Sequence, residues 1–248
     1  MPKLFVVSDL HSFYTPLKKA LDEKGFDSTN EDHWLIVCGD TFDRGNESVE
    51  VLHYLMTLDR KVLIRGNHDD LLDECCLRGF PHRHDRLNGT SKTIYHIGGG
   101  SDFSECCDIA YHKLAEYRNT LVNYFETKNY IFVHGWIPCS QSNDYYGVVK
   151  YNPNWRKCTD SEWEIARWTN GIESAMKGLI EPGKTIVCGH WHCSYGHSLD
   201  SAKTDNWLSE FENDAIWEPW YHEGCIAIDR CTAHTEEVNV LVLEDDFI

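Results

Sequence analysis

The sequence of 248 residues contains no long hydrophobic run, because its apolar segments are short and interrupted by charged or polar residues. A helix that crosses a membrane needs about 18 consecutive apolar residues, so no membrane span is predicted. The first apolar segment, residues 3–9, is too short for the hydrophobic core of a signal peptide, and we therefore expect a cytoplasmic protein. Internal repeats and low-complexity tracts are also lacking, which argues against a fibrous or disordered protein.

Basic residues are scarce relative to acidic ones. The chain has 23 Lys and Arg against 40 Asp and Glu, a formal net charge of −17. Such a surface repels phosphate backbones, so no stable nucleic-acid binding is expected. A phosphorylated substrate is still compatible with this charge, because bound divalent cations can reverse the electrostatic field locally.

Paired cysteines at metal-binding spacing are missing as well. None of the eleven cysteines lies in a CxxC pair, so a zinc ribbon has no support. Two pairs are adjacent, Cys75–Cys76 and Cys106–Cys107, and adjacent cysteines seldom have the geometry of a disulfide. We expect free thiols that behave mostly as small buried hydrophobic residues in a reducing compartment.

Apolar material is sufficient for a core, at 42% hydrophobic and 25% charged residues. In the first half of the chain, short apolar runs with β-branched residues alternate with amphipathic segments. The predicted strands are residues 4–8, 34–38 and 61–64, and the predicted helices are residues 15–24, 48–58 and 70–77. This alternation predicts an α/β fold with a largely parallel sheet.

The second half is less regular. Residues 88–102 are predicted as a loop and residues 107–125 as a helix, and strands are predicted at 130–133 and 185–188. Residues 225–229 and 238–243 are predicted to pair as antiparallel strands. The whole chain, 1–248, is predicted to be a single domain, with residues 138–184 as a candidate cap insertion. Four tryptophans near or within it (Trp136, Trp155, Trp163 and Trp168) either form an aromatic wall at the site or pack in the core.

Polar groups that can bind metal follow five of the apolar runs. They are Asp9-Leu10-His11, Gly39-Asp40, Gly66-Asn67-His68, His134-Gly135 and Gly189-His190-Trp191-His192. In open α/β sheets, ligands bind beyond the carboxyl ends of the strands. Aspartate, asparagine and histidine together suit a divalent metal such as manganese, iron or zinc. A single histidine after a strand is usually structural, but five such strand ends indicate one shared site.

In this order, the five segments resemble the motif set of the calcineurin-like metallophosphoesterases. The longer form Gly39-Asp40-Thr41-Phe42-Asp43-Arg44-Gly45 and the preceding Arg65 are similar to the PPP-type Ser/Thr protein phosphatases. Bacterial and phage relatives of these phosphatases include the symmetrical dinucleoside tetraphosphatases. The resemblance spans residues 9–192 and implies a four-layer α/β/β/α sandwich with a loop-rich cap.

The resemblance also implies a pair of divalent metal ions, with manganese preferred over iron, zinc or magnesium. One ion would be held by Asp9, His11 and His192, the other by Asn67, His134 and His190, with Asp40 bridging both. In such a site, two cations lower the pKa of a shared water and clamp phosphate oxygens. The resemblance implies direct attack by a metal-bound hydroxide, without a phosphoenzyme.

Five further residues receive roles from the same resemblance or from their position. His68 would protonate the leaving oxygen, with Asp43 orienting its ring. Arg44 would grip phosphate oxygens through its planar guanidinium, although a surface ion pair is an alternative. Arg167 is a candidate second phosphate clamp, and Arg65 is expected to form a structural ion pair.

Three functions follow from this set. The first is a protein Ser/Thr phosphatase-like phosphomonoesterase that acts on a phosphoprotein or a small phosphoester. The second is a hydrolase of dinucleoside polyphosphates or cyclic-nucleotide phosphodiesters. The third is a non-catalytic metal-binding scaffold, against which the complete set of Asp43, Arg44 and His68 argues, because a scaffold does not need a general acid.

Overall fold

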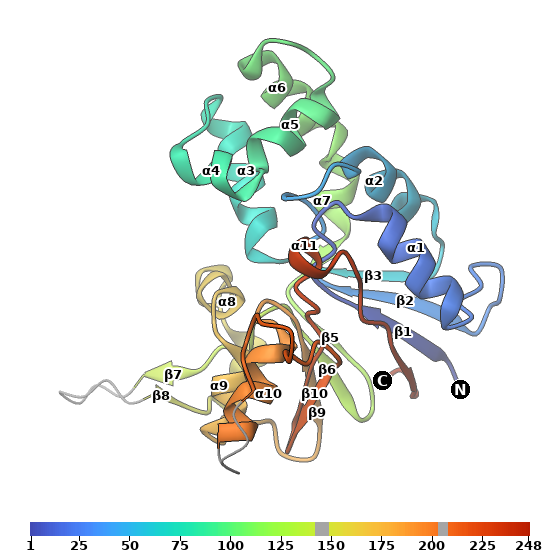
Figure 1. The fold of residues 1–248 in the computed structure, drawn as a ribbon, viewed down its shortest axis with the longest axis vertical. Coiled ribbons are helices and arrows are strands. Elements are labelled where there is room, and N and C mark those ends of the chain that lie inside the picture. Colours follow the sequence, from blue (N-terminus) through green and yellow to red (C-terminus); the bar gives the residue numbers. More distant parts are fainter. Residues whose placement is uncertain (142–148, 203–207) are drawn as a thin grey trace.

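The computed structural model describes residues 1–141, 149–202 and 208–248, and their strands form two stacked five-stranded sheets (Figure 1). The first sheet has the order β12-β1-β2-β3-β4, in which β1 to β4 run parallel and β12 is antiparallel to β1. Its strands are β1 (Lys3–Val7), β2 (His33–Cys38), β3 (Lys61–Ile64), β4 (Leu121–Val122) and β12 (Leu241–Glu244).

The second sheet has the order β10-β11-β9-β6-β5, with a parallel centre and antiparallel edges. Its strands are β5 (Phe125–Glu126), β6 (Tyr130–Phe132), β9 (Thr185–Cys188), β10 (Trp220–His222) and β11 (Cys225–Ala227). A separate short hairpin pairs β7 (Ser140–Gln141) with β8 (Val149–Lys150).

Alternation along β1 shows why the sheets stack. Leu4 and Val6 pack between the sheets, where they belong to the same cluster as Phe132 of the second sheet. Phe5 and Val7 point the other way and belong to the cluster formed with the helices. Because side chains alternate across a strand, a fully apolar run can bury both faces, and β1 lies inside the molecule for this reason.

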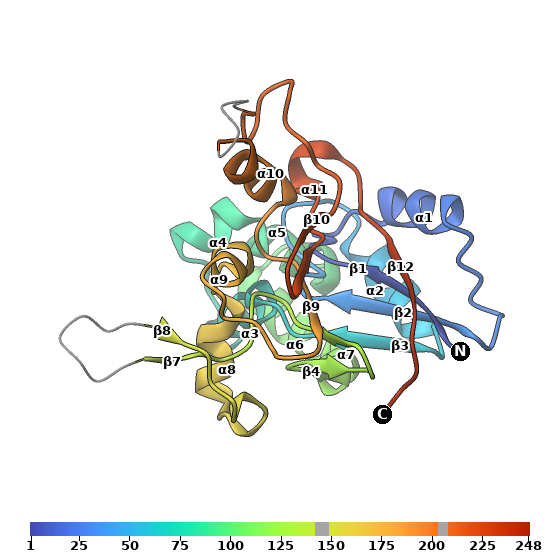
Figure 2. The same cartoon turned by 90° about the horizontal axis from the view of Figure 1, so that it is seen from below.

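Helices cover the outer face of each sheet. The first sheet is covered by α1 (Tyr14–Glu23) and α2 (Ser48–Thr57), as Figure 2 shows. The second sheet is covered by α8 (Asp160–Arg167), α9 (Gly171–Met176) and α10 (Cys193–Ala202), with the 3-10 turn η1 (Trp155–Lys157) beside them. The described residues therefore form the predicted four-layer α/β/β/α sandwich.

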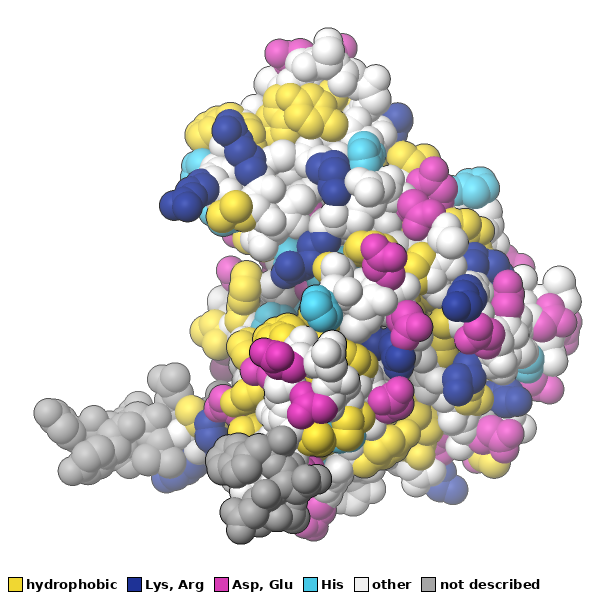
Figure 3. All heavy atoms as spheres, in the orientation of Figure 1, with side chains coloured by type: hydrophobic (Ala, Val, Ile, Leu, Met, Phe, Trp, Pro, Cys, Tyr) yellow, Lys and Arg dark blue, Asp and Glu magenta, His cyan; other side chains and the backbone are white. Residues whose placement is uncertain are grey.

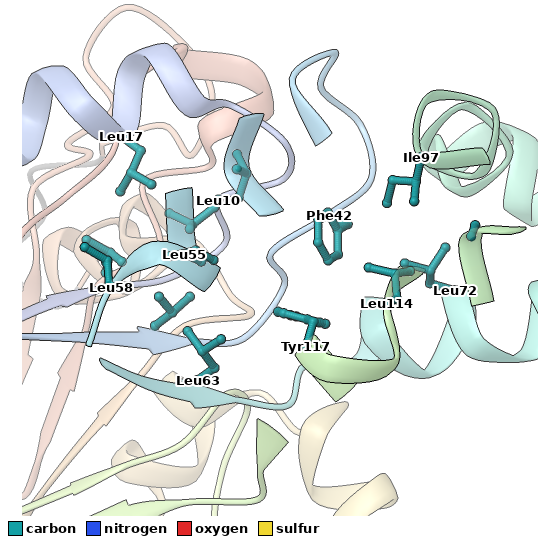
Figure 4. Packing of buried hydrophobic residues seen from close by; sticks show 14 of the residues in the cluster. Leu10, Leu17, Phe42, Leu55, Leu58, Leu63, Leu72, Ile97, Leu114 and Tyr117 are labelled. Carbon is teal, nitrogen blue, oxygen red and sulfur yellow. The ribbon is translucent and has the colours of Figure 1, made fainter. Parts of the chain in front are cut away.

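A helical lobe is inserted between β3 and β4 and rises above the sheets in Figure 1. Its helices are α3 (Asn67–Arg78), α4 (Arg83–Asn88), α5 (Thr90–Gly98), α6 (Phe103–Lys113) and α7 (Ala115–Thr120). Figure 4 shows Phe42 and Tyr117 between the lobe and the first sheet; their rings meet edge to face at 5.0 Å. The lobe and the sheet thus share one core, which fixes the lobe beside the strand ends.

Three predictions on secondary structure were wrong. The predicted loop at 88–102 contains α5, because Gly89 and Gly99, at φ +87° and +76°, flank a helix that buries Ile94 and Ile97. The predicted helix at 107–125 ends in strands, since tertiary pairing of β4 with β3 overrides local propensity. The predicted pair of 225–229 with 238–243 does not form, because β11 and β12 belong to different sheets.

The candidate cap insertion at 138–184 includes residues 142–148, which lie outside the described residues. Its remaining residues contain β7, β8, η1, α8 and α9, and its status as a cap stays a prediction. All eleven cysteines lie in the described part of the chain and are free thiols. Among the described helices, none combines the length and apolarity that a membrane crossing requires.

Candidate active site

The carboxyl ends of strands from both sheets meet at one place. Asp9 follows β1, Asp40 follows β2 and Asn67 follows β3, and these parallel strands end at the same edge of the first sheet. From the second sheet, His134 follows β6 and His190 follows β9. Parallel pairing alone brings the first three together, and stacking of the sheets adds the histidines.

Backbone strain is concentrated at these strand ends. A positive φ angle is unfavourable for residues other than glycine, at roughly 1–2 kcal/mol each, and such residues tend to cluster at functional sites. Here the positive φ angles belong to Asp9, His11, Ser12, Asp40, Asp43, Arg44 and His190, with values between 47° and 76°. Five of these residues line one cavity, namely Asp9, His11, Asp40, Arg44 and His190.

Two glycines allow the candidate metal ligands to approach the neighbouring backbone closely. A Cβ atom on Gly66 would collide with the carboxylate of Asp40, and a Cβ atom on Gly39 would collide with the imidazole of His134. Gly39 also has a φ of +83°, which disfavours other residues. The glycines in these motifs therefore make room for the candidate ligands beside them.

Asp40 lies at the centre of the site. The Nε2 atom of His134 lies 3.3 Å from Oδ1 of Asp40, and the Nε2 atoms of His11 and His68 each lie 3.9 Å from Oδ2. Burial raises the pKa of Asp40, but His134, His68 and His11 outweigh this and hold the pKa well below its usual value. The carboxylate is therefore ionised and faces three imidazoles.

The imidazole tautomers follow from backbone hydrogen bonds. Nδ1 of His11 lies 2.9 Å from the carbonyl oxygen of Phe42, and Nδ1 of His134 lies 2.9 Å from that of Cys38. A carbonyl oxygen only accepts, so each Nδ1 carries the hydrogen. This leaves Nε2 to face Asp40, which is the orientation of metal-binding histidines with an outer hydrogen-bond partner.

The protonation states of the histidines around Asp40 are compatible with the binding of a cation. Burial lowers the pKa of His11 to about 3, and burial together with His134 lowers the pKa of His190 to about 4, so both rings are neutral. The lone pair of His11 thus faces the carboxylate of Asp40 with no proton between two acceptors. Burial would lower the pKa of His134, but Asp40 raises it to about 10, and a cation would displace that proton.

Candidate ligands form groups compact enough for a metal. Among the described residues, one group is His11, Asp40 and His68, and another is Asp40, His134 and His190, with ligand atoms within 4.8 Å of one another. Oδ1 of Asn67 lies 2.8 Å from Nε2 of His134. Oδ2 of Asp9 accepts the backbone N–H of His190 at 3.0 Å. The nitrogen and oxygen donors suit a divalent metal.

Two predicted residues are held by other partners. His192 lies beside the site, but its Nε2 pairs with a carboxylate oxygen of Glu210. The guanidinium of Arg167 is buried, with Nε at 2.7 Å from Asp70 and Nη1 at 3.0 Å from Asn123. The structure does not bring Arg167 to the site, because these contacts hold it between α8 and the lobe.

His68, Asp43 and Arg44 form a connected set at the edge of the Asp40-centred group. Oδ2 of Asp43 lies 2.8 Å from Nδ1 of His68 and accepts the hydroxyl of Thr90 at 2.6 Å. Burial lowers the pKa of His68, but Asp40 and Asp43 outweigh this and raise it. Nη2 of Arg44 lies 3.5 Å from Nε2 of His68. No carboxylate among the described residues pairs with Arg44, so its guanidinium is available for an anion.

These groups open into a cavity of about 440 Å³. It is lined by Asp9, His11, Asp40, Arg44, Asn67, His68, His190 and His192, with Trp168, Trp191 and Phe211 among the other residues. Figure 3 shows the surface hollowed between the helical lobe and the body of the molecule, on the side of α8. Such a volume is typical of small-molecule sites.

Arg65 and Asp69 support the site from outside the cavity. Arg65 forms ion pairs of 2.6 Å with Asp70 and with Asp73, which confirms its predicted structural role. Asp69 accepts the N–H of Gly66 and the hydroxyl of Tyr117, both at 2.8 Å, and closes the start of α3. Both residues therefore fix the turn that carries Asn67.

The sequence analysis missed Asp229 and Thr90. Asp229 is buried in the cavity wall, and burial together with Asp9 raises its pKa to about 8. The same signal that identified the other residues applies to it, since it ends the apolar run 225–229. Thr90 was missed because it lies in the segment predicted as a loop.

Comparisons with known proteins agree with this geometry. The family model for the calcineurin-like phosphoesterases matches residues 2–217. A protein of Ectopseudomonas mendocina named symmetrical bis(5'-nucleosyl)-tetraphosphatase is 34% identical over an alignment that covers 86% of this chain and 91% of that protein. A Pseudomonas fluorescens protein of the same name is 31% identical over 138 residues, 54% of this chain but only 43% of the relative's length.

Solved structures share the fold. A crystal structure provisionally named a diadenosine tetraphosphatase has a TM-score of 0.53 at 15% identity, covering 98% of this chain and 91% of that one. A cold-active protein-tyrosine phosphatase of a Shewanella species has a TM-score of 0.53 at 16% identity, covering 98% of this chain and 76% of that one. The family model extends over most of the sequence, and the chain belongs to the calcineurin-like phosphoesterase family.

Proposed function

We propose that the protein hydrolyses dinucleoside polyphosphates in a reaction that depends on two divalent metal ions, manganese being the first candidate. The observation that carries hydrolysis is the convergence of His68, Asp43 and Arg44 beside the Asp40-centred group. A general acid, a group that orients it and a guanidinium with no carboxylate partner among the described residues are together suited to the cleavage of a phosphoester.

The nitrogen and oxygen donors around Asp40 support the following proposal for the metal ligands. Asp40 would contact both ions, with Asp9, His11 and His192 toward one and Asn67, His134 and His190 toward the other. When bound, the ion pair lowers the pKa of a water molecule and neutralises phosphate charge. His192 would have to exchange Glu210 for the metal, whereas His11 and His134 already present Nε2 toward Asp40.

The remaining residues handle the proton and the phosphate. His68 would carry a proton on Nε2, because its Nδ1 is bonded to Asp43 and because Asp40 and Asp43 outweigh burial and raise its pKa. It would pass this proton to the oxygen that leaves. Arg44 would bind a non-bridging phosphate oxygen next to that oxygen, since its guanidinium lies beside Nε2 of His68.

The substrate class rests on the relatives. Both relatives described above carry the name symmetrical bis(5'-nucleosyl)-tetraphosphatase, and one of them aligns over nearly its whole length. This favours the dinucleoside polyphosphate alternative over the protein Ser/Thr phosphatase hypothesis. The cavity volume of about 440 Å³ also exceeds what a phosphate group alone needs.

A substrate panel tests the proposal. The metal-loaded protein is given diadenosine tetraphosphate, a phosphoserine peptide and 4-nitrophenyl phosphate, and products are separated by ion-exchange chromatography. We expect diadenosine tetraphosphate to give the highest kcat/KM and to yield two molecules of nucleoside diphosphate. A higher kcat/KM for the phosphopeptide would overturn the substrate class, and no turnover of any of the three would favour the scaffold.

A matched pair of variants links the activity to the site. Asp40→Asn removes the central carboxylate and should lower kcat/KM by a factor on the order of 100 or more, because metal charge stabilisation contributes several kcal/mol. Asp108→Asn makes the same chemical change at an exposed position of α6 and should leave kcat/KM unchanged. Equal activities of the two variants would contradict the assignment of Asp40.

A further inference from the structure

Two large aromatic side chains stand half exposed at the mouth of the cavity. Trp168 is 51% exposed and Phe211 is 52% exposed, and both line the cavity. The other tryptophans of the candidate aromatic wall (Trp136, Trp155 and Trp163) are buried in the core of the second sheet. Exposed apolar surface at a cavity commonly marks a place where a ligand binds.

Trp168 is fixed by its neighbours in the chain. It follows α8 directly, and its backbone N–H donates to the carbonyl oxygen of Ile165. The residue before it, Arg167, is tied to Asp70 of the helical lobe at 2.7 Å. Its ring lies 6.0 Å from the ring of His190, at 87°. The indole is therefore held next to the imidazole of His190, a candidate metal ligand, and about half of its surface is exposed to solvent.

Phe211 is fixed by packing against other rings. Its centroid lies 4.8 Å from that of His192, 6.0 Å from Trp217 and 5.9 Å from His234. The adjacent Glu210 pairs with His192, which ties this segment to the site. Phe211 thus lies beside a different candidate ligand from the one that Trp168 contacts.

We propose that Trp168 and Phe211 are stacking platforms for the planar bases of a nucleotide substrate whose phosphates bind at the Asp40-centred group. The idea rests on the proposed function for the position of the phosphates. Aromatic faces bind any base with little sequence preference, because every base has a π-face. A dinucleoside polyphosphate carries a base at each end of its phosphate chain, which matches two platforms beside two different histidines.

Competitive inhibition separates base recognition from phosphate recognition. The inhibition constants of ADP and of inorganic pyrophosphate are measured against turnover of 4-nitrophenyl phosphate, since both inhibitors carry two phosphates and only ADP carries a base. Trp168→Ala and Phe211→Ala should each raise the inhibition constant of ADP by about 5- to 100-fold, the usual effect of removing one stacking partner. The inhibition constant of pyrophosphate should change less than about twofold in the same variants.

Three further variants exclude simpler explanations. Trp168→Phe should recover most of the affinity for ADP, whereas Trp168→Leu, which is apolar but not aromatic, should not. Phe80→Ala removes a phenylalanine that is 54% exposed and lies outside the cavity lining, and it should change neither inhibition constant. The stacking assignment is overturned if Trp168→Leu binds ADP as well as the unaltered protein, or if ADP and pyrophosphate weaken in parallel.

A failure of the proposed function can be distinguished from a failure of the stacking proposal. The unaltered protein would then turn over 4-nitrophenyl phosphate but not diadenosine tetraphosphate, while the comparison of ADP with pyrophosphate would still test the two platforms. Loss of ADP selectivity in the two alanine variants would support base stacking even then.

Discussion

Replacing His68 with asparagine removes the imidazole that faces the cavity while it leaves in place the seven other side chains that are proposed to hold the two metal ions. The ring connects Asp43, 2.8 Å from Nδ1, with Arg44, 3.5 Å from Nε2. The backbone N–H of residue 68 still donates to Asp40, because the substitution does not alter it. A positioned general acid contributes about 10²–10⁴-fold, so kcat/KM for phenyl phosphate should fall by that factor.

The loss should depend on the leaving group. Nitrophenolate needs little protonation, so kcat/KM for 4-nitrophenyl phosphate should fall by roughly tenfold or less, well below the loss for phenyl phosphate. Metal content, measured by inductively coupled plasma mass spectrometry, should match that of the unaltered protein. His112→Asn, the same change at an exposed position of α6, serves as the control. Equal losses for the two esters would refute the assignment of His68 as the acid.

The same substitution, His68→Asn, should also lower the free energy of unfolding modestly, which can be measured on the same samples. Asp43 is fully buried and would keep the hydrogen bond from Thr90 but lose its partner on His68. An underpartnered buried group typically costs about 1–3 kcal/mol. We therefore expect urea unfolding to show that the His68→Asn variant is still folded in the absence of urea. A fall in its activity could then not be explained by unfolding.

Gly39→Ala should abolish tight metal binding and destabilise the fold by about 2–4 kcal/mol, because it combines an unfavourable backbone with a collision against His134. Gly25→Ala, at φ +76° with open space around it, should cost only the backbone part, about 1–2 kcal/mol; equal costs in urea unfolding would contradict the collision. Asp245→Asn should destabilise the protein by about 1–3 kcal/mol at neutral pH, since Asp245 accepts the hydroxyl of Thr127 at 2.7 Å and joins the end of β12 to the second sheet. Burial raises the pKa of Asp245 but its hydrogen bonds outweigh this and lower it, so its contribution should be lost as the pH falls through that pKa; a pH-independent difference between the unfolding free energies of the two proteins would contradict this.

The local sequence was sufficient to identify most of the residues that line the candidate active site. Short apolar runs ending in aspartate, asparagine or histidine identified Asp9, Asp40, Asn67, His134 and His190, and the structure brings all of them to adjoining strand ends. A parallel sheet places the carboxyl ends of its strands at one edge, which explains why the residues after β1, β2 and β3 lie together. The two histidines follow β6 and β9 of the second sheet, and only the stacking of the sheets brings them to the same place.

Contacts between residues far apart in the chain could not be predicted from such local patterns. Arg167 looked like a phosphate clamp, since an arginine near a predicted phosphate site has that chemistry. Its burial against Asp70 depends on how α8 meets the lobe, which no local pattern encodes. The exposure of Trp168 and the burial of Trp163, five residues before it, likewise depend on which side of α8 faces the second sheet.

The sequence by itself determined the α/β class and the order of the candidate ligands, because both depend on residue type and on strand ends that short apolar runs reveal. The role of His68 as the general acid was implied by the family resemblance and stays a prediction. Only the tertiary structure decided which side chains share the cavity, that Glu210 holds His192, and that residues 90–98 are helical. These depend on contacts between segments far apart in the chain, whose free energies arise only when the two sheets and the lobe pack together.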